Sequence, residues 1–258
     1  MMIDERAIVA PGAKLDPTVE VGPFAMIGEN VEIGPGTVVG PFAMIDGWTK
    51  IGANCRIFHH ASVGSIPQDL KYRGEPTTLT VGDGTIIREF ATLNLGTVGG
   101  GGKTAVGKNC LLMAYSHVAH DCIVGDGVIM ANSATLAGHV TVDDFVIIGG
   151  LSAVHQFVKL GEHSIVGGCS AVAQDVPPYV TVSGNRAKLY GLNLIGLKRR
   201  DFSEETVKAL KKAYKAIFQT SKGLADTIVK LRESEDYKLP EVKKLVDFVA
   251  NSERGVTR

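Results

Sequence analysis

An aliphatic side chain recurs at every sixth position through most of the stretch from Ile3 to Val172 in this 258-residue chain. One series runs from Ile3 to Val63, a short one from Val81 to Leu93, and a third from Val106 to Val172. A period of six fits neither an α-helix nor an ordinary β-strand. It is typical of hexapeptide repeats, whose short strands and turns stack into a prismatic parallel β-helix.

Three hexads would make one coil of a triangular prism, and successive coils would stack at the strand spacing of about 4.8 Å. The aliphatic side chain of each hexad would point into the prism. The small residue that follows it, often a glycine, would let the backbone turn the corner. We therefore expect a mainly β domain at residues 1–189 with a continuous aliphatic core.

Two stretches interrupt the hexads, and we expect both to be loops that leave the prism, near residues 64–80 and 96–105. In the first, Asp69 and Glu75 stand where aliphatic residues are due. In the second, the step from Leu93 to Val106 is not a multiple of six, so the phase slips. Insertions on a rigid scaffold often carry function, and a tolerated surface loop is the alternative for each.

A helical pattern replaces the hexads in residues 190–258, which we expect to form a C-terminal α-helical domain. We expect Ser203 to be the N-cap of a helix, because apolar residues then recur at helical spacing as far as Phe218. A weaker helix is expected at 224–231. A third would begin at Pro240, with Gly255 as a stop signal.

Charge separates the two parts, although the whole chain sums to zero. The C-terminal part carries an excess of basic residues, and several of them share one face of the helix expected after Ser203. Such a face could steer an acidic partner toward it, and a solvated helix face is the alternative. The basic residues concerned are Lys198, Arg199, Arg200, Lys208, Lys211, Lys212 and Lys215.

No apolar run approaches the roughly 18 residues that a membrane span needs. The first residues include Asp4 and Glu5 rather than a basic segment that leads into an apolar one. We therefore expect a cytoplasmic protein without membrane insertion. A nucleic-acid partner is not expected either.

Five of the seven histidines lie in the third series of hexads, and four of them, at positions 117, 120, 139 and 155, are candidates for a site. His139 lies one coil and one position beyond His120, so the side chains can gather on one side of the prism. An imidazole next to Asp121 could act as a general base near neutral pH. Neutral imidazoles also bind zinc, and the spacing leaves proton chemistry and metal binding both open.

Several longer motifs narrow these alternatives. They are QDLKYRGEPT at residues 68–77, SHVAHDC, NSATLAGHV, GGLSAVHQF, VGGCSAVAQDVPPYV and GLKRRDF. Together with the hexads they closely resemble the UDP-N-acetylglucosamine O-acyltransferases that begin lipid A synthesis in Gram-negative bacteria. The resemblance runs nearly from end to end, from Ile3 to Arg258.

This resemblance implies a left-handed parallel β-helix and a homotrimer with active sites between subunits. It implies transfer of an R-3-hydroxyacyl chain from acyl carrier protein to the 3-hydroxyl of UDP-N-acetylglucosamine, with no metal and no cofactor. The family's general base corresponds to His120, and Asp121 would orient or stabilise its imidazole. Gly138 would donate its backbone N–H to the tetrahedral oxyanion.

The resemblance also implies substrate contacts. The acyl chain would be measured at Gly168, where a glycine leaves the groove open and favours a chain longer than ten carbons. Acidic acyl carrier protein would meet Arg199, Arg200 and the lysines at 208, 211, 212 and 215. The residues implied to bind sugar, diphosphate or the carrier's phosphopantetheine arm are Asp69, Lys71, His117, His139, His155, Gln156, Asn193 and Arg199.

Two positions depart from the family pattern, Leu95 where a basic residue is frequent and Ile195 where an acidic residue is frequent. They leave open whether the acceptor sugar bears a 3-hydroxyl or a 3-amine. Three rivals remain. The related N-acyltransferase places an extra domain before the prism, whereas hexads begin here at Ile3. A γ-type carbonic anhydrase would bind zinc with a histidine pair five positions apart, and a non-catalytic scaffold would have no use for clustered histidines.

Overall fold

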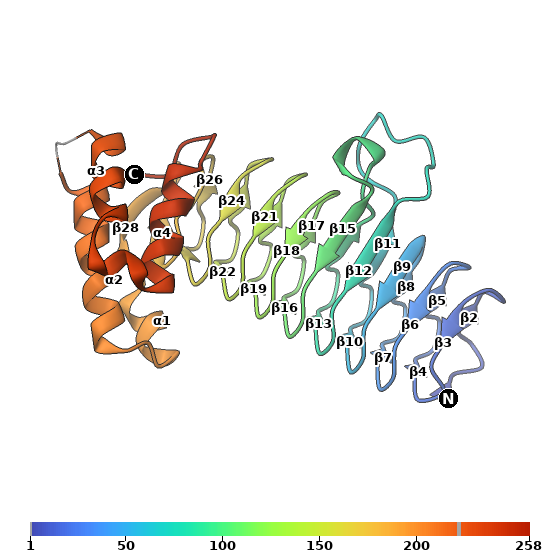
Figure 1. Cartoon of the computed structure of the whole chain (residues 1–258). Coiled ribbons are helices and arrows are strands. Elements are labelled where there is room, and N and C mark those ends of the chain that lie inside the picture. Colours follow the sequence, from blue (N-terminus) through green and yellow to red (C-terminus); the bar gives the residue numbers. More distant parts are fainter. Residues whose placement is uncertain (1, 221–222) are drawn as a thin grey trace.

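A long triangular prism of short parallel strands, capped at one end by helices, forms the body of the molecule (Figure 1). The structure is a computed structural model that describes residues 2–220 and 223–258. The chain passes from one face of the prism to the next and returns to the first face after one coil. Three sheets result, here named A, B and C.

Sheet A consists of β1 (Met2–Ile3), β4 (Glu20–Val21), β7 (Val38–Val39), β10 (Arg56–Ile57), β13 (Ile86–Ile87), β16 (Leu111–Leu112), β19 (Ile129–Met130), β22 (Ile147–Ile148), β25 (Ile165–Val166), β27 (Val180–Ser183) and β28 (Lys188–Leu192). Sheet B consists of β2 (Ile8–Val9), β5 (Met26–Ile27), β8 (Met44–Ile45), β11 (Ser62–Ser65), β14 (Thr92–Asn94), β17 (His117–Val118), β20 (Thr135–Leu136), β23 (Ala153–Val154) and β26 (Ala171–Val172). Sheet C consists of β3 (Lys14–Leu15), β6 (Glu32–Ile33), β9 (Trp48–Ile51), β12 (Thr78–Val81), β15 (Lys103–Val106), β18 (Ile123–Val124), β21 (Thr141–Val142) and β24 (Lys159–Leu160).

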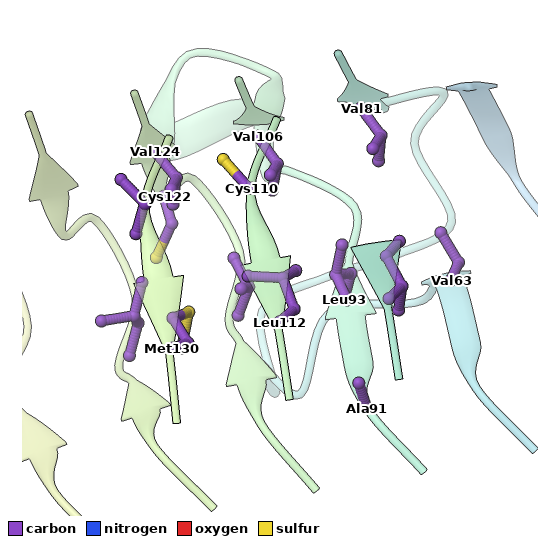
Figure 2. Packing of buried hydrophobic residues seen from close by; sticks show 14 of the residues in the cluster. Val63, Val81, Ala91, Leu93, Val106, Cys110, Leu112, Cys122, Val124 and Met130 are labelled. Carbon is purple, nitrogen blue, oxygen red and sulfur yellow. The ribbon is translucent and has the colours of Figure 1, made fainter. Parts of the chain in front are cut away.

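The expected parallel β-helix and its aliphatic core are confirmed. Strands pair in parallel so that a residue lies beside its counterpart three hexads later, as when Ile3 faces Val21. The second residue of each two-residue strand points inward. Figure 2 shows Val81, Val106 and Val124 of sheet C facing Leu93 of sheet B and Leu112 of sheet A across an apolar interior.

The small residue after each aliphatic was expected to let the backbone turn the corner, and this expectation is wrong. The residue after each aliphatic is small because the coils approach closely there: a Cβ on Gly22 would lie 2.9 Å from the Pro41 nitrogen of the next coil. The left-handed backbone conformation instead falls two positions after the small residue, as at Phe24 and Phe42, which have φ of 59° and 58°. Glycine is therefore needed directly after the aliphatic for close packing and not for its conformational freedom.

Both interruptions of the hexads leave the prism at the corner between sheets B and C, here called the B–C edge. Residues 66–77 connect β11 to β12, and residues 95–102 connect β14 to β15 with a short 3-10 turn, η1 (Val98–Gly100). Because β11 pairs with β14 and β12 with β15, the two loops lie in adjacent coils. Figure 1 shows them projecting together from one side of the prism.

The C-terminal helices are α1 (Leu194–Arg199), α2 (Glu204–Phe218), α3 (Leu224–Arg232) and α4 (Pro240–Ala250), with a 3-10 turn, η2 (Glu235–Lys238), before α4. The three expected helices are confirmed, and Ser203 caps α2 by accepting from the Thr206 N–H. The expected division between residues 189 and 190 falls inside β28, which pairs antiparallel with β27.

Two features of this part differ from the expectation. The short helix α1 was not expected, because it carries no long apolar pattern. Gly255 does not stop a helix, because α4 ends at Ala250. The chain instead returns to the prism, where the Gly255 carbonyl accepts from the Asp175 N–H and Val256 pairs with Asp175. Within residues 2–220 and 223–258, no helix is long and apolar enough to cross a membrane.

The apolar column predicts a large penalty for truncation inside it. Leu112 is fully buried between Ile87 and Met130 of neighbouring coils. We expect Leu112→Ala to lower the free energy of unfolding by about 2–5 kcal/mol, because the cavity adds to the lost transfer free energy. Urea titration followed by circular dichroism measures it. Leu70→Ala is the control, since Leu70 is 94% exposed. Equal effects of the two changes would contradict the assigned core.

Candidate active site

Residues that are three hexads apart in this prism stack directly above one another, and this places the histidines. His120 and Gly138 occupy the same position of the B–C edge in consecutive coils. Asp121 and His139 form a second column beside them, with φ of 61° and 62°. The expected gathering of histidines on one side of the prism is therefore present, on the same edge as the two loops.

The next coil continues both columns, with Gln156 above Gly138 and Phe157 above His139. The backbone of Phe157 is again left-handed, with φ of 64°. We call residues 119–121, 137–139 and 155–157, which together form this part of the B–C edge, the histidine edge.

The imidazole of His120 is held by its neighbour Asp121. Nδ1 of His120 lies 2.7 Å from Oδ2 of Asp121, whose side chain is 1% exposed. A carboxylate can only accept hydrogen bonds, so Nδ1 carries the proton in this pair. The other ring nitrogen, Nε2, is then left as an acceptor in the neutral ring. This is the arrangement that a general base requires.

The 95–102 loop closes over the Asp121 carboxylate. The Thr97 N–H donates to Oδ1 at 2.8 Å, and the Thr97 hydroxyl donates to Oδ2 at 2.7 Å. The Thr104 hydroxyl accepts from the Asp121 N–H at 2.8 Å, which fixes the backbone beneath. With His120, three donors face the buried carboxylate and offset the cost of its burial.

Gly138 leaves room for the His120 ring. A Cβ at this position would lie 2.6 Å from Cε1 of His120, so the ring rests on bare backbone. The Gly138 N–H has no acceptor among residues 2–220 and 223–258. The turn itself does not use this N–H, since Pro23 and Pro41 occupy the equivalent position at another corner. A free N–H beside the His120 ring can therefore serve an oxyanion.

His139 and Phe157 are in direct contact within the second column. Their rings stack at 4.4 Å between centroids, and His139 meets the His120 ring edge-on at 5.1 Å. Nδ1 of His139 lies 3.8 Å from Oδ2 of Asp121, which is beyond hydrogen-bond distance. His139 is held by stacking, and its ring nitrogens remain available to a ligand.

His117 faces outward from sheet B, just before the turn that carries His120. Its Nδ1 lies 2.7 Å from the Thr92 hydroxyl in the preceding coil. Burial, and secondarily the neighbouring His120, lower the pKa of His117 below its usual value of 6.5. The ring is therefore neutral at physiological pH and able to donate or accept a hydrogen bond.

Arg254 joins the histidine edge from the end of the chain, and sequence reasoning missed it. Its guanidinium lies 2.9 Å from Nδ1 of His155 and donates to the Ala173 carbonyl at 3.0 Å. Both His155 and Gln156 are exposed. Only the return of residues 252–257 to the prism brings Arg254 here, and no local pattern in the sequence signals that return.

Asp69 and Lys71 lie in the 66–77 loop on the same edge. Asp69 Oδ1 accepts from the Lys71 N–H at 2.9 Å, and the Lys71 side chain is exposed. Among the described residues, no hydrogen bond or ion pair joins either side chain to His120. The loop leaves the prism two coils before the His120 turn.

Three other expected site residues, Asn193, Arg199 and Arg200, lie on the opposite side of the prism. They line a cavity of about 810 Å³ between sheet A and α1, together with Ile195 and other residues. The Asn193 side chain is committed to structure, because it accepts from the Gly196 N–H and donates to the His163 carbonyl. The Arg200 guanidinium lies over the Phe145 ring at 3.9 Å.

Gly168 lies at the corner between sheets A and B. A Cβ there would meet nothing closer than the Gly150 carbonyl oxygen at 3.4 Å, so the position is open. On α2, the lysines at 208, 211, 212 and 215 are all exposed. Lys212 pairs with Asp236 at 3.0 Å, which leaves the charges at 208, 211 and 215 to give the face its basic character.

A metal site is the alternative interpretation of the histidines. Ligand atoms of His120, Asp121 and His139 lie within 4.8 Å of one another. Both carboxylate oxygens of Asp121 already accept hydrogen bonds from Thr97, and His120 Nδ1 is directed at one of them. The donor set is thus arranged to hold a proton on His120 and not to bind a cation.

The chain matches known proteins along its whole length. Residues 175–257 match a family described as UDP N-acetylglucosamine O-acyltransferase, domain 2, and residues 6–41 and 103–138 match the bacterial transferase hexapeptide family. The acyl-[acyl-carrier-protein]–UDP-N-acetylglucosamine O-acyltransferase of Anaeromyxobacter dehalogenans is 52% identical over 258 residues and covers 100% of both chains. The enzyme of the same name from Thermodesulfovibrio yellowstonii is 49% identical over 99% of both chains.

Solved structures agree over the whole length. The UDP-N-acetylglucosamine O-acyltransferase of Moraxella catarrhalis superposes with a TM-score of 0.97 at 41% identity and covers 100% of both chains. The UDP-N-acetylglucosamine acyltransferase of Campylobacter jejuni gives 0.92 at 40% identity, with 99% of this chain and 98% of that chain covered. These likenesses confirm the left-handed parallel β-helix of hexapeptide repeats with C-terminal helices.

The environment of His117 predicts its titration. Because burial disfavours the charged ring, the folded protein binds a proton at His117 at lower pH than the unfolded chain does. We expect the NMR titration midpoint of the His117 ring to lie below its usual pKa of 6.5, and stability supplied by this group to be lost as pH falls below that value. Comparison with His117→Gln identifies the signal. A midpoint above the usual pKa would contradict the half-buried placement.

Proposed function

Since the chain belongs to the family of UDP-N-acetylglucosamine O-acyltransferases, we propose that it transfers an R-3-hydroxyacyl chain from acyl carrier protein to the 3-hydroxyl of UDP-N-acetylglucosamine, the first step of lipid A synthesis. The observation that carries the proposal is the pairing of a proton acceptor with a free amide on the histidine edge. His120 is oriented by Asp121, and its ring rests on Gly138, whose N–H has no acceptor in the described part of the chain.

His120 acts as the general base in this proposal. Nε2 takes the proton of the sugar 3-hydroxyl while its oxygen attacks the thioester carbonyl carbon, and the carbonyl becomes a tetrahedral oxyanion. The Gly138 N–H donates to that oxyanion. When the C–S bond breaks, the proton passes from His120 to the departing thiolate, so the ring is neutral again. Asp121 stabilises the imidazolium between the two steps.

The sugar nucleotide binds along the histidine edge. Polar groups there face the sugar and the diphosphate, and the 66–77 loop reaches toward them from two coils away. The residues proposed to make these contacts are Asp69, Lys71, His117, His139, His155 and Gln156.

The acyl chain crosses the outer face of sheet B. Small outward residues such as Ala153 and Ala171 leave space on this face. Gly168 stands at the far corner of the face and limits the length of the groove. Because that corner is open, the groove accepts a chain longer than ten carbons.

We propose a homotrimer, which the family resemblance implies and which the separation of the expected site residues supports. In a triangular prism, the B–C edge is the corner opposite sheet A, so His120 and the Arg199 cavity cannot form one site within a chain. They can do so when the sheet A side of a second copy packs against the histidine edge of the first. A heterologous contact of this kind forms a ring when its rotation closes, and in the proposed trimer three copies close the ring.

Acyl carrier protein is strongly acidic, and the exposed lysines of α2 with Arg199 and Arg200 give it a docking face. Arg199, with Asn193 fixing the start of α1, would hold the diphosphate or the phosphopantetheine arm. The proposed chemistry uses no metal and no cofactor, because His120 and the Gly138 amide supply the proton transfer and the oxyanion contact. No nucleic acid takes part, and we place the reaction in the cytoplasm.

Of the two departures from the family pattern, only Ile195 lies where it could contact a substrate. Leu95 is 1% exposed and packs against Gly47, so it faces the core and not a substrate. Ile195 is 70% exposed at the rim of the sheet A cavity, where an acidic residue is frequent in the family. It is the residue to examine if the acceptor is the 3-amino sugar. Mass spectrometry of products from both acceptors, with a ladder of R-3-hydroxyacyl carrier proteins, decides between hydroxyl and amine.

Removal of the base should abolish turnover without unfolding the protein. His120 is half-buried at an edge and outside the aliphatic column, so we expect His120→Ala to lower the rate by about 10²–10⁴-fold in a protein that remains folded, although Asp121 loses one of its donors. His60→Ala is the control, since His60 stacks between Phe42 and Phe90 at another corner. Full activity in His120→Ala would reject the assigned base, and unfolding of it would make the residue structural.

The acyl-chain placement has its own test. We expect Gly168→Met to shift the preferred donor to a shorter chain, because the new side chain fills the open corner. Gly168→Ala should shift it less, since a methyl group fits the available space. Competition among carrier proteins of different chain length measures the preference. An unchanged preference in Gly168→Met would place the end of the groove elsewhere.

A further inference from the structure

The 95–102 loop is built onto the carboxylate that orients His120. Thr97 occupies the N-cap of η1, and its hydroxyl oxygen accepts from the Gly100 N–H at 3.2 Å while its proton goes to Asp121. Gly100 then lies against the carboxylate, where a Cβ would be 2.0 Å from Cγ of Asp121. This loop therefore packs on Asp121 with both a hydrogen-bonding residue and a residue without a side chain.

The Thr97 hydroxyl and the His120 imidazole share one oxygen of Asp121. Oδ2 accepts from the Thr97 hydroxyl at 2.7 Å and from His120 Nδ1 at 2.7 Å. Oδ1 accepts only from the Thr97 N–H among the described residues. The carboxylate side chain is 1% exposed, so water cannot readily replace a lost donor on Oδ2.

Few charged or titratable groups surround this pair. His139 of the next coil meets the His120 ring edge-on and lies 3.8 Å from Oδ2, and His117 lies on the strand that leads into the turn. The 95–102 loop, which packs on the carboxylate, contains no charged side chain. The hydrogen bond from Thr97 is thus the main contact from the loop that can change how strongly Asp121 holds a proton on His120.

We propose that Thr97 is a positioning residue for the reaction, and that its hydroxyl limits the basicity of Asp121 and so the proton affinity of His120. This inference rests on the proposed role of His120 as the base. The hydrogen bond from Thr97 draws charge from Oδ2, which weakens the hold of Asp121 on an imidazolium.

The loop also fixes where Oδ2 lies. The Thr97 N–H and hydroxyl bind both carboxylate oxygens, so the carboxylate cannot rotate about its own axis without losing one of them. Gly100 allows η1 to approach until this bidentate contact forms. The loop inserted in one coil thus sets the chemistry of the neighbouring coil.

Removal of the Thr97 hydroxyl should change the pH dependence of the reaction in one predicted direction. In Thr97→Val, Oδ2 keeps only its imidazole donor, so Asp121 attracts the proton on His120 more strongly. The acid limb of the pH profile, where kcat/KM rises as the base loses its proton, should therefore move to higher pH by about one unit. At pH values below the limb, the rate therefore falls by about tenfold, and at high pH most of it returns. In Thr97→Ser, which retains the hydroxyl donor, the acid limb of kcat/KM should lie at the same pH as in the unaltered protein.

Two matched controls separate this role from a general loss of a buried hydroxyl or a change in the loop. Thr37→Val removes a buried hydroxyl that donates to the Gly52 carbonyl in a remote coil. This change should leave the acid limb of kcat/KM at the pH of the unaltered protein. Gly99→Ala should retain the full rate, because a Cβ there meets nothing within 4 Å. Gly100→Ala, its neighbour, should lower the rate by pushing η1 off Asp121.

A limb that does not move in Thr97→Val overturns the inference, whatever happens to the rate, because a merely structural threonine would lower activity uniformly with pH. If Thr97→Val does not fold, Thr97→Ala removes the same donor with a smaller side chain and must show the same shift. NMR titration of the His120 ring in these variants reports the proton affinity without substrate. An upward shift there with no acyl transfer in any protein would retain the Thr97 role and reject the proposed function.

Discussion

The stacking of coils in a register of three hexads is the constraint on which the rest of this molecule depends. It stacks equivalent residues of successive coils in columns. A side-chain type that recurs at the same position of each coil therefore forms a continuous line along the prism. The inward columns are aliphatic and form the apolar core. The corner columns are not needed for that core, which leaves them free to carry stacked aromatic rings at one edge and the histidine edge at another.

The same register explains how a regular scaffold supplies a reactive site without large distortions. The corner turn has no backbone acceptor for one of its N–H groups, and at Gly138 that N–H lies beneath the His120 ring. The departures from regularity are the two loops, and both lie on the B–C edge. One of them covers Asp121 with Thr97 and Gly100, which buries the carboxylate yet keeps it hydrogen-bonded. Rigidity comes from the repeats, and the local chemistry comes from the interruptions.

Local periodicity was enough to predict much of this structure. The aliphatic positions predicted the prism and its core, and the step from His120 to His139 placed both on one edge. The Ser203 cap and the start of a helix at Pro240 were also correct. Sequence reasoning misjudged the corner glycines, because a close contact with the next coil cannot be seen in a single hexad. Leu95 could not be placed in the core either, since the phase slip hides its register. Long-range contacts were the other limit: the return of the chain end, which carries Arg254 to His155, joins distant segments and has no local signature.

The central claim is that the histidine edge of one chain and the Arg199 cavity of another form a single acyl-transfer site. Co-expression of His120→Ala and Arg199→Ala chains with different tags, followed by isolation of the mixed assemblies, tests it most directly. About a third of the sites in the isolated mixed trimers would combine an intact edge with an intact cavity, so two inactive variants should regain activity together. Mixtures of His120→Ala with Asp121→Ala, both altered on the same edge, should stay inactive. No recovery in the first mixture, with mixed assemblies present, would contradict the account.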